Sequence, residues 1–171
     1  MKKLFFSLLL FCFTASNAQN GYRYNVDLSK VQNDKLAVEL FTPQLNKPTV
    51  IFQFPRIIPG TYSIADYGQF ITDVKAFDKK GKALPVSKLN VNRWKIANAT
   101  ALHRISYMVD DIFDSELKHG IYPMAATNVE EGKNYVLHSP GLFGFIDGGN
   151  KLPFELSIEK PRNFYGSTAL K

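Results

Sequence analysis

Short stretches in which apolar and polar residues alternate recur along most of this 171-residue chain. The stretch from Tyr22 to Leu28 shows the pattern clearly, because every second residue is apolar or aromatic. Successive side chains of a β-strand point to opposite faces, so a period of two is typical of a strand with one buried face. We expect strands at residues 22–28, 36–40, 49–54, 72–77, 82–86, 92–96, 103–109, 135–138 and 154–160. After residue 18 no long apolar stripe has helical spacing, so the sequence predicts an all-β fold, an antiparallel β-sandwich with long loops and one or two short helices.

The turn Asp78-Lys79-Lys80-Gly81 gives the firmest local prediction. Glycine readily takes the positive φ that tight turns need, so residues 72–77 and 82–86 are expected to form a β-hairpin around it. The runs at residues 36–40 and 49–54 follow one another closely along the chain, and we expect them to pair as neighbouring strands.

Loops are expected where proline, glycine and polar residues replace the alternation. Residues 55–60 contain two prolines and a glycine, which remove hydrogen-bond donors and permit sharp bends. Residues 63–70 are expected to form one short helix. The weakly patterned stretch at residues 110–132 is expected to hold long loops or a short helix.

Residues 1–18 have the three parts of a secretory signal peptide. Lys2 and Lys3 supply the positive charge, Leu4–Phe13 is the apolar part, and Ser16-Asn17-Ala18 provides small residues before a cleavage site. The apolar part is about ten residues long, well short of the roughly 20 that a membrane-spanning helix needs. We therefore expect cleavage after Ala18 and a soluble product that is secreted or periplasmic.

Cleavage would leave one domain, residues 19–171, and would remove the only cysteine, Cys12. A domain without cysteine can form neither disulfides nor thiolate zinc sites. The formal net charge of the full chain is +6, but the basic residues are scattered among acids rather than clustered. This distribution does not favour nucleic-acid binding.

The candidate catalytic residues do not form a familiar constellation. His103, His119 and His138 are separated by 16 and 19 positions, and the chain lacks the H-E-x-x-H motif that places two zinc ligands on one helix face. A G-x-S-x-G nucleophile elbow and a phosphate-binding loop are also absent. We expect no catalytic residue and no metal site in this chain. A hydrolase would require the three histidines to converge with acids in one cleft.

Two acidic pairs and a set of aromatic residues remain as candidates for binding. Asp110-Asp111 and Glu130-Glu131 are each adjacent carboxylates of the kind that glycosidases and calcium sites use, although such pairs in loops are usually solvated. The aromatic residues of interest are Tyr62, Tyr67, Phe70, Tyr122, Tyr135, Phe143, Phe145 and Phe154. They are typical of core packing, but an exposed group of them would suit a stand-alone secreted module that binds carbohydrate or protein.

Several motifs together resemble a known family. These are Ile58-Pro59-Gly60-Thr61-Tyr62-Ser63-Ile64, Phe70-Ile71, Asp73-Val74-Lys75-Ala76-Phe77-Asp78 with Gly81, Lys88-Leu89-Asn90-Val91-Asn92-Arg93-Trp94-Lys95-Ile96, Ile105-Ser106-Tyr107 and Leu142-Phe143-Gly144-Phe145. In this order they resemble the N-terminal domain of the glycyl-aminopeptidase family of zinc metallopeptidases. The resemblance covers most of residues 22–165.

The resemblance implies that this chain is the non-catalytic N-terminal β domain of an exported zinc aminopeptidase. In that family a helical catalytic domain with H-E-x-x-H binds zinc, so the resemblance implies that zinc and the catalytic residues belong to a domain absent from this chain, which ends at Lys171. The β domain would pack against the catalytic domain and shape its peptide-binding cleft. The family also suggests a contact with the substrate amine near residues 128–138, where Glu130 or Glu131 could pair with the ammonium.

Overall fold

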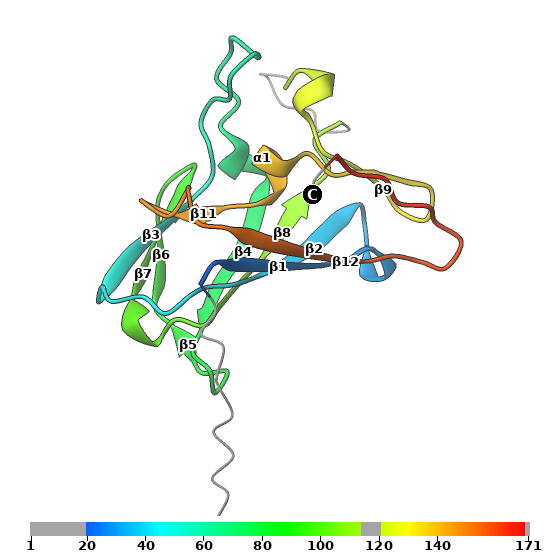
Figure 1. Ribbon diagram of the computed structural model, residues 1–171. Coiled ribbons are helices and arrows are strands. Elements are labelled where there is room, and N and C mark those ends of the chain that lie inside the picture. The colour runs from blue at the N-terminus through cyan, green and yellow to red at the C-terminus, as the bar shows by residue number, and fades with distance from the viewer. Residues whose placement is uncertain (1–19, 114–120, 170–171) are drawn as a thin grey trace, which may run out of the picture.

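The computed structural model describes residues 20–113 and 121–169, which fold mostly as strands in two packed sheets (Figure 1). Within these residues the larger sheet has six strands, in the order β12 (Phe154–Glu159), β1 (Tyr22–Asp27), β2 (Lys35–Phe41), β8 (Arg104–Asp110), β4 (Ile71–Phe77) and β5 (Ala83–Leu84). The smaller sheet has four, in the order β11 (Phe145–Ile146), β3 (Thr49–Gln53), β7 (Arg93–Ala97) and β6 (Val86–Asn90). The predicted all-β, sandwich-like fold is confirmed.

The remaining elements are short. Strands β9 (Asn128–Glu130) and β10 (Asn134–Val136) form a separate hairpin, and the described residues contain one α-helix, α1 (Ser139–Leu142). Single 3-10 turns occur at η1 (Leu28–Lys30), η2 (Tyr67–Phe70), η3 (Ala99–Ala101) and η4 (Pro123–Ala125). In the part of the chain that the structure describes, no helix is long and apolar enough to cross a membrane.

The core lies between the two sheets, where the alternating apolar side chains meet. Along β2 and β8 the residues Leu36, Val38, Ile105 and Val109 are completely buried, while their neighbours in sequence face outward. Trp94 on β7 is also buried, and its ring lies 6.1 Å from that of Phe52, its register partner on the neighbouring strand β3. The period-two pattern therefore reports the buried face correctly in the centre of the sandwich.

Strand pairing departs from the sequence-based expectation in two places. Strands β2 and β3 are not neighbours: β2 pairs with β1 and β8, whereas β3 lies in the other sheet between β7 and β11. The connecting residues 42–48 contain two prolines and carry the chain from one sheet to the other. The hairpin around Asp78–Gly81 is confirmed, but Pro85 divides its second arm, so β5 stays in the large sheet and β6 joins the small one.

Two further differences concern a helix and the direction of an edge strand. Of the helix expected at residues 63–70, only the last four residues form a turn, the 3-10 element η2. Asp66, just before it, has a left-handed backbone conformation with φ of 45°, which prevents a helix from extending through it. At the other end of the large sheet, β12 pairs with β1 in parallel, whereas the other paired strands are antiparallel.

Three buried tyrosine hydroxyls attach the α1–β11 segment to the large sheet. Tyr107 donates to the carbonyl of Leu142 at 2.8 Å, Tyr24 donates to the carbonyl of Gly144 at 2.8 Å, and Tyr22 accepts from the amide of Ile146 at 3.1 Å. Burial raises the pKa of Tyr24 and Tyr107 above their ordinary value, so their hydroxyls stay protonated and keep donating even in alkaline solution. These bonds satisfy polar groups that the segment would otherwise bury without partners.

Candidate functional site

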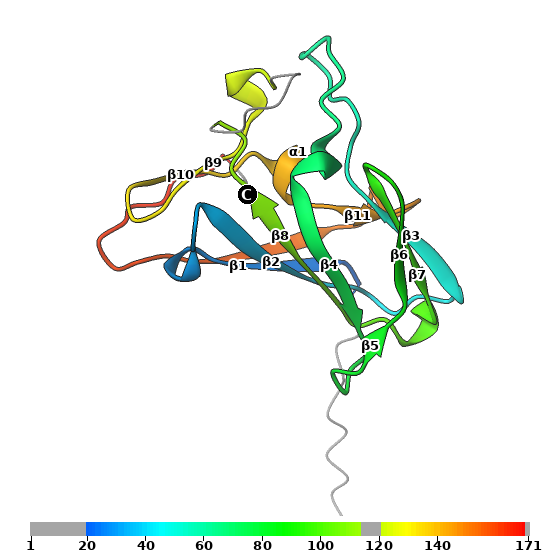
Figure 2. The same cartoon turned by 180° about the vertical axis from the view of Figure 1, so that it is seen from behind.

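Two segments project beyond the sheets at the same end of the sandwich, at the top of Figures 1 and 2. The first, the β3–η2 loop, comprises residues 54–66 and contains the whole Ile58–Ile64 motif. The second, the β8–β9 segment, runs from residue 111 through η4 to residue 127, and its residues 114–120 lie outside the described part. Long loops on a rigid scaffold frequently carry function, so this end is the first candidate site.

The β3–η2 loop is closed at its base by hydrogen bonds between its two ends. The carbonyl of Arg56 accepts from the amides of Ala65 and Asp66, both at 2.9 Å, and the carbonyl of Pro55 accepts from the amide of Tyr67 at 3.2 Å. A loop whose ends are joined in this way is a compact Ω-type loop rather than an open connection. The base therefore has a defined position relative to the sheets.

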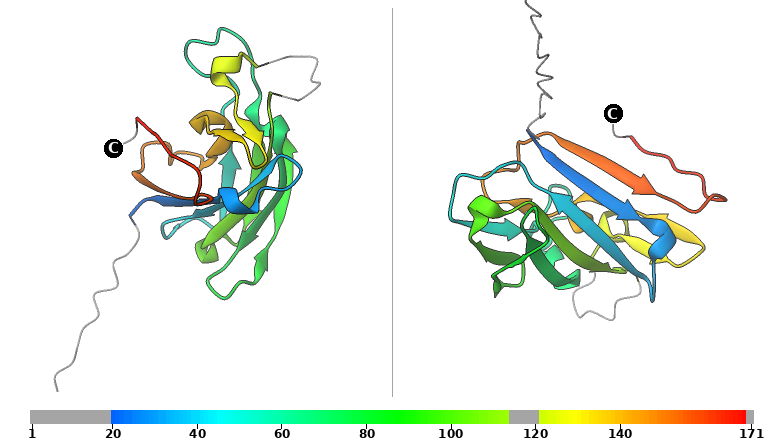
Figure 3. Two further views of the ribbon diagram at one scale, coloured as in Figure 1. Left: turned by 90° about the vertical axis from the view of Figure 1, so that its right-hand side faces the viewer. Right: turned by 90° about the horizontal axis from the view of Figure 1, so that it is seen from below.

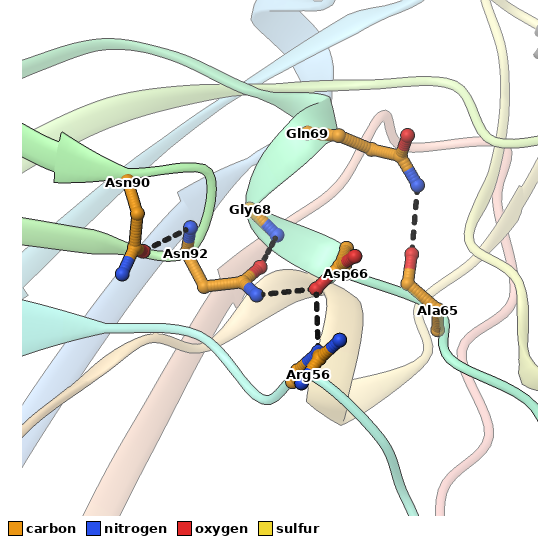
Figure 4. A network of polar contacts seen from close by, with 7 residues as sticks. All are labelled: Arg56, Ala65, Asp66, Gly68, Gln69, Asn90 and Asn92. Carbon is orange, nitrogen blue, oxygen red and sulfur yellow. Dashed lines mark hydrogen bonds and ion pairs between the residues drawn. The ribbon is translucent and has the colours of Figure 1, made fainter.

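A side-chain network centred on Asn92 fixes this base to the turn between β6 and β7 (Figure 4). Asn92 is 7% exposed; its Oδ1 accepts from the amide of Gly68 at 2.9 Å, and its Nδ2 donates to Asp66 Oδ1 at 2.7 Å. Asp66 also lies 3.6 Å from Arg56 Nε, and Asn90 Oδ1 accepts from the amide of Asn92 at 3.0 Å. The side-chain oxygen and the side-chain nitrogen of Asn92 thus each have a hydrogen-bond partner.

The tip of the β3–η2 loop holds an aromatic ring in solvent. Tyr62 is 97% exposed and has a φ of 55°, a left-handed conformation that costs a residue other than glycine roughly 1–2 kcal/mol. Thr61 beside it is buried, and its hydroxyl donates to the carbonyl of Ile58 at 3.1 Å. The other exposed large apolar side chains of the loop are Ile57 and Ile64. The tip is folded on itself and presents an apolar surface.

The β8–β9 segment is anchored by Asp111 and by a tyrosine. Asp111 Oδ1 accepts from the amide of Phe113 at 2.6 Å, and its Oδ2 accepts from the amide of Val129 at 2.9 Å. The Tyr67 hydroxyl, from the base of the other loop, donates to the carbonyl of Ala125 at 2.9 Å. Exposed apolar side chains on this segment are Phe113, Tyr122 and Met124. The two projecting segments are thus joined at their bases and both end in apolar side chains.

The first acidic pair proves to be two separate structural contacts. Asp110 lies 2.9 Å from the ammonium of Lys35 on the adjacent strand, whereas Asp111 caps backbone amides. Their carboxylates therefore have different partners within the protein.

The second pair, Glu130 and Glu131, lies at the tip of the β9–β10 hairpin, which points sideways from the projecting end in Figures 1 and 2. Glu130 Oε1 is 2.7 Å from the ammonium of Lys133. Glu131 Oε2 accepts from the amide of Asn33 at 3.2 Å, while the amide of Glu131 donates to Asp34 Oδ1 at 2.9 Å. The hairpin tip is thereby attached to the turn before β2. The predicted contact with a substrate amine stays a prediction.

The histidines occupy unrelated positions. The ring of His103 packs against Phe41 with centroids 5.5 Å apart, and the ring of His138 lies 6.1 Å from that of Tyr67. His138 Nδ1 is buried without a hydrogen-bond partner, and burial lowers the pKa of its imidazole. His119 lies outside the described residues. Among the residues that the structure describes, no three His, Cys, Asp or Glu side chains are grouped so that they could hold a metal ion.

A groove of about 930 Å³ runs beside β12, away from the projecting loops. Its walls are β12, the β9–β10 hairpin and the C-terminal residues 160–169. The apolar side chains that line it are Leu28, Tyr135, Leu137, Phe143, Leu156, Ile158, Phe164 and Tyr165. This groove is the second candidate site.

The aromatic residues singled out in the sequence divide by burial. Tyr67 and Phe70 belong to the core, Tyr135, Phe143 and Phe145 are half-buried, and Tyr62, Tyr122 and Phe154 are exposed. The exposed three lie on different elements, the two projecting segments and β12. They therefore do not form one platform.

Sequence reasoning did not identify the Asn92 network. Asn92 was noticed only within a motif, and its partners Asp66 and Gly68 lie 26 and 24 positions away. One local signal was available, because a polar amide directly before the buried strand β7 must satisfy its hydrogen bonds inside the protein. Its partners could not be named without the tertiary structure.

Comparisons with known proteins agree with the resemblance found in the motifs. A family model described as the Peptidase M61 N-terminal domain matches residues 23–171. Among solved structures, an aminopeptidase N family protein from Idiomarina loihiensis has the same fold, with a TM-score of 0.68 over 82% of this chain and 22% sequence identity. The match covers 22% of that protein, so this chain spans about a fifth of its length. None of the curated proteins matches. This chain therefore belongs to the family of peptidase M61 N-terminal domains.

Proposed function

We propose that this chain is the non-catalytic N-terminal domain of an exported zinc aminopeptidase, where it packs against the catalytic domain and shapes the substrate cleft. The family match over residues 23–171 carries the proposal, because an N-terminal domain of a peptidase family implies a catalytic domain in the same polypeptide. The fixed base of the β3–η2 loop and its exposed tip support a role as one wall of a cleft, since loops held by a rigid scaffold position binding groups precisely enough for recognition.

Zinc would belong to the catalytic domain. The described residues of this chain do not fit a zinc site, because the three or four grouped nitrogen, sulfur or oxygen ligands that zinc needs are not found among them. The contribution of this domain would be the binding and orientation of a peptide, and no step of the hydrolysis is assigned to its side chains.

A carboxylate on the β9–β10 hairpin would hold the free amine of the substrate. Glu130 and Glu131 are adjacent, and each now has a partner that a substrate ammonium could replace or share. A charge-assisted hydrogen bond of this kind contributes about 1.5–3 kcal/mol, equivalent to a change of roughly ten-fold or more in affinity.

The test uses the longer polypeptide that contains this chain and the following catalytic domain. We expect it to release an N-terminal residue from an aminoacyl substrate in a zinc-dependent reaction. Glu130→Gln or Glu131→Gln should then raise KM about tenfold with little change in kcat, because a binding contact is lost. Glu155→Gln, an exposed acid on β12, is the matched control and should leave KM unchanged. Parental kinetics in both hairpin variants would refute the amine contact.

Two further results would decide the wider proposal. The exported protein should begin at Gln19, which N-terminal sequencing of the secreted or periplasmic fraction would show. A longer polypeptide without aminopeptidase activity, together with binding of an oligosaccharide or a protein by the isolated chain, would instead establish a stand-alone binding module.

A further inference from the structure

Two neighbouring strands share a face but differ sharply in burial. Tyr22 and Val26 on β1 are 4% and 2% exposed, whereas their register partners on β12, Phe154 and Ile158, are 49% and 41% exposed. Paired residues in a sheet point to the same side, so all four side chains face the inner side of the large sheet. The layer that covers β1 therefore does not extend over β12.

The exposed inner face of β12, called the open strip below, has an unusual sequence for the edge of a sheet. Natural edge strands are commonly protected by lysine, proline, a bulge or a covering segment. Between Phe154 and Glu159 the strand has no lysine or proline, and its parallel pairing with β1 has no irregularity. Its inward residues are all apolar, so the strand has the composition of a covered strand rather than a solvent-exposed edge.

The groove beside β12 gives this strip a definite shape. Its outer wall is the C-terminal segment of residues 160–169, which runs along β12 (Figure 3, right). Within this wall Lys160 Nζ donates to the carbonyl of Phe164 at 2.5 Å, and the Phe164 ring packs 5.3 Å from that of Tyr135. Tyr165, next in the chain, is 93% exposed. The groove is therefore lined with apolar groups on several sides but is open to solvent.

We infer that this groove is the docking site for apolar side chains of the catalytic domain in the same polypeptide. The inference rests on the proposed function and adds the surface at which the two domains meet. The C-terminal segment is itself a wall of the groove, so residues that follow it in a longer polypeptide would begin beside the strip. Covalent connection also raises the effective concentration of such a partner, so docking requires less contact area than it would between separate proteins.

Thiol labelling can test the docking, because residues 19–171 contain no cysteine. Ile158→Cys places a thiol in the groove, and Ser157→Cys places one on the opposite face of the same strand. In a chain of residues 19–171 both should react rapidly with a maleimide. In the longer polypeptide Ile158→Cys should react at least about tenfold more slowly, because reaction then requires the interface to open, while Ser157→Cys should be unaffected.

Phe154→Cys is a second probe of the same face, and thermal unfolding of each variant checks that the fold is retained. Equal labelling of Ile158→Cys and Phe154→Cys in the short and long forms would overturn the inference. Protection that appears in the short chain and grows with its concentration would also overturn it, since a second copy would then be the occupant. Aminopeptidase activity of the longer form is measured separately, so its absence would refute the proposed function whether or not the groove is protected.

Discussion

Substitutions at Asn92 and Asp66 test most directly how the base of the β3–η2 loop is held in place. Asn92→Ala would leave the buried Gly68 amide without an acceptor, which costs about 1–3 kcal/mol, and would remove one hydrogen bond from Asp66. We expect a total loss of roughly 2–4 kcal/mol in the free energy of unfolding. For a domain of this size that corresponds to a fall of very roughly 5–15 °C in Tm.

Asn92→Asp is nearly identical in shape but is expected to be destabilising for a different reason. The new carboxylate keeps an acceptor for the Gly68 amide, yet it replaces the donor that lies 2.7 Å from Asp66 Oδ1. Two carboxylates whose charge centres lie about 4 Å apart repel by up to about 4 kcal/mol at an effective dielectric constant near 20. Arg56, 3.6 Å from Asp66, reduces this repulsion in part. The loss should become smaller at acid pH, where one carboxyl is protonated.

The double variant decides whether this reasoning is right. Asp66→Asn alone should cost at most about 1 kcal/mol, because it removes only a partly exposed ion pair with Arg56. In the Asn92→Asp background, however, it restores a donor opposite the carboxylate and should recover at least about 1–2 kcal/mol. Chemical denaturation of the four proteins measures the coupling, with Asn90→Ala as a control that removes only a turn contact. If the double variant is no more stable than Asn92→Asp alone, the network does not hold the loop as described.

Two other predictions concern the core and its response to pH. Gly144→Ala places a Cβ 2.5 Å from the Phe52 ring and should lower the free energy of unfolding by about 1–3 kcal/mol, as measured by chemical denaturation. Gly166→Ala is the control and should be neutral, because its Cβ meets only Lys160 at 3.9 Å. Equal stability of the two variants would contradict the packing around Gly144. Burial lowers the pKa of His138 in the folded protein, so on acidification the unfolded chain binds a proton at this residue before the folded protein does. The contribution of His138 to stability should therefore be complete above about pH 6.5 and decrease as the pH falls towards the lowered pKa of the folded state. His138→Gln should flatten this part of the Tm–pH curve, and a parental slope in that variant would show that His138 is not responsible.

Local patterns predicted the elements well, and their success has a simple basis. The alternation in β1 and β8 reflects side chains on opposite faces of a strand, a property of the backbone alone. The turn at Asp78–Gly81 was also found because Asp78 and Gly81 make the turn with their own side chain and backbone freedom. Neither inference requires knowledge of a distant residue.

Pairing and exposure could not be predicted in the same way. Strands β2 and β3 are close in sequence but belong to different sheets, because each pairs with a strand that comes much later in the chain. Ile158 has the apolar alternation of a buried strand, but it is 41% exposed because the layer that buries the inner face of β1 does not extend over it. Asp66 and Asn92 form a network only when the β6–β7 turn meets the loop base.

For the candidate sites, too, the sequence determined some features and the tertiary structure determined others. The motifs indicated the family, which the match over residues 23–171 confirms, but they did not single out the β3–η2 loop as a site. By itself the sequence also determined the all-β class, since strand periodicity is local and needs only neighbouring residues. The tertiary structure alone decided that Asn92 holds the loop and that the inner face of β12 lies open, because both depend on which segments, distant in sequence, pack together and which do not.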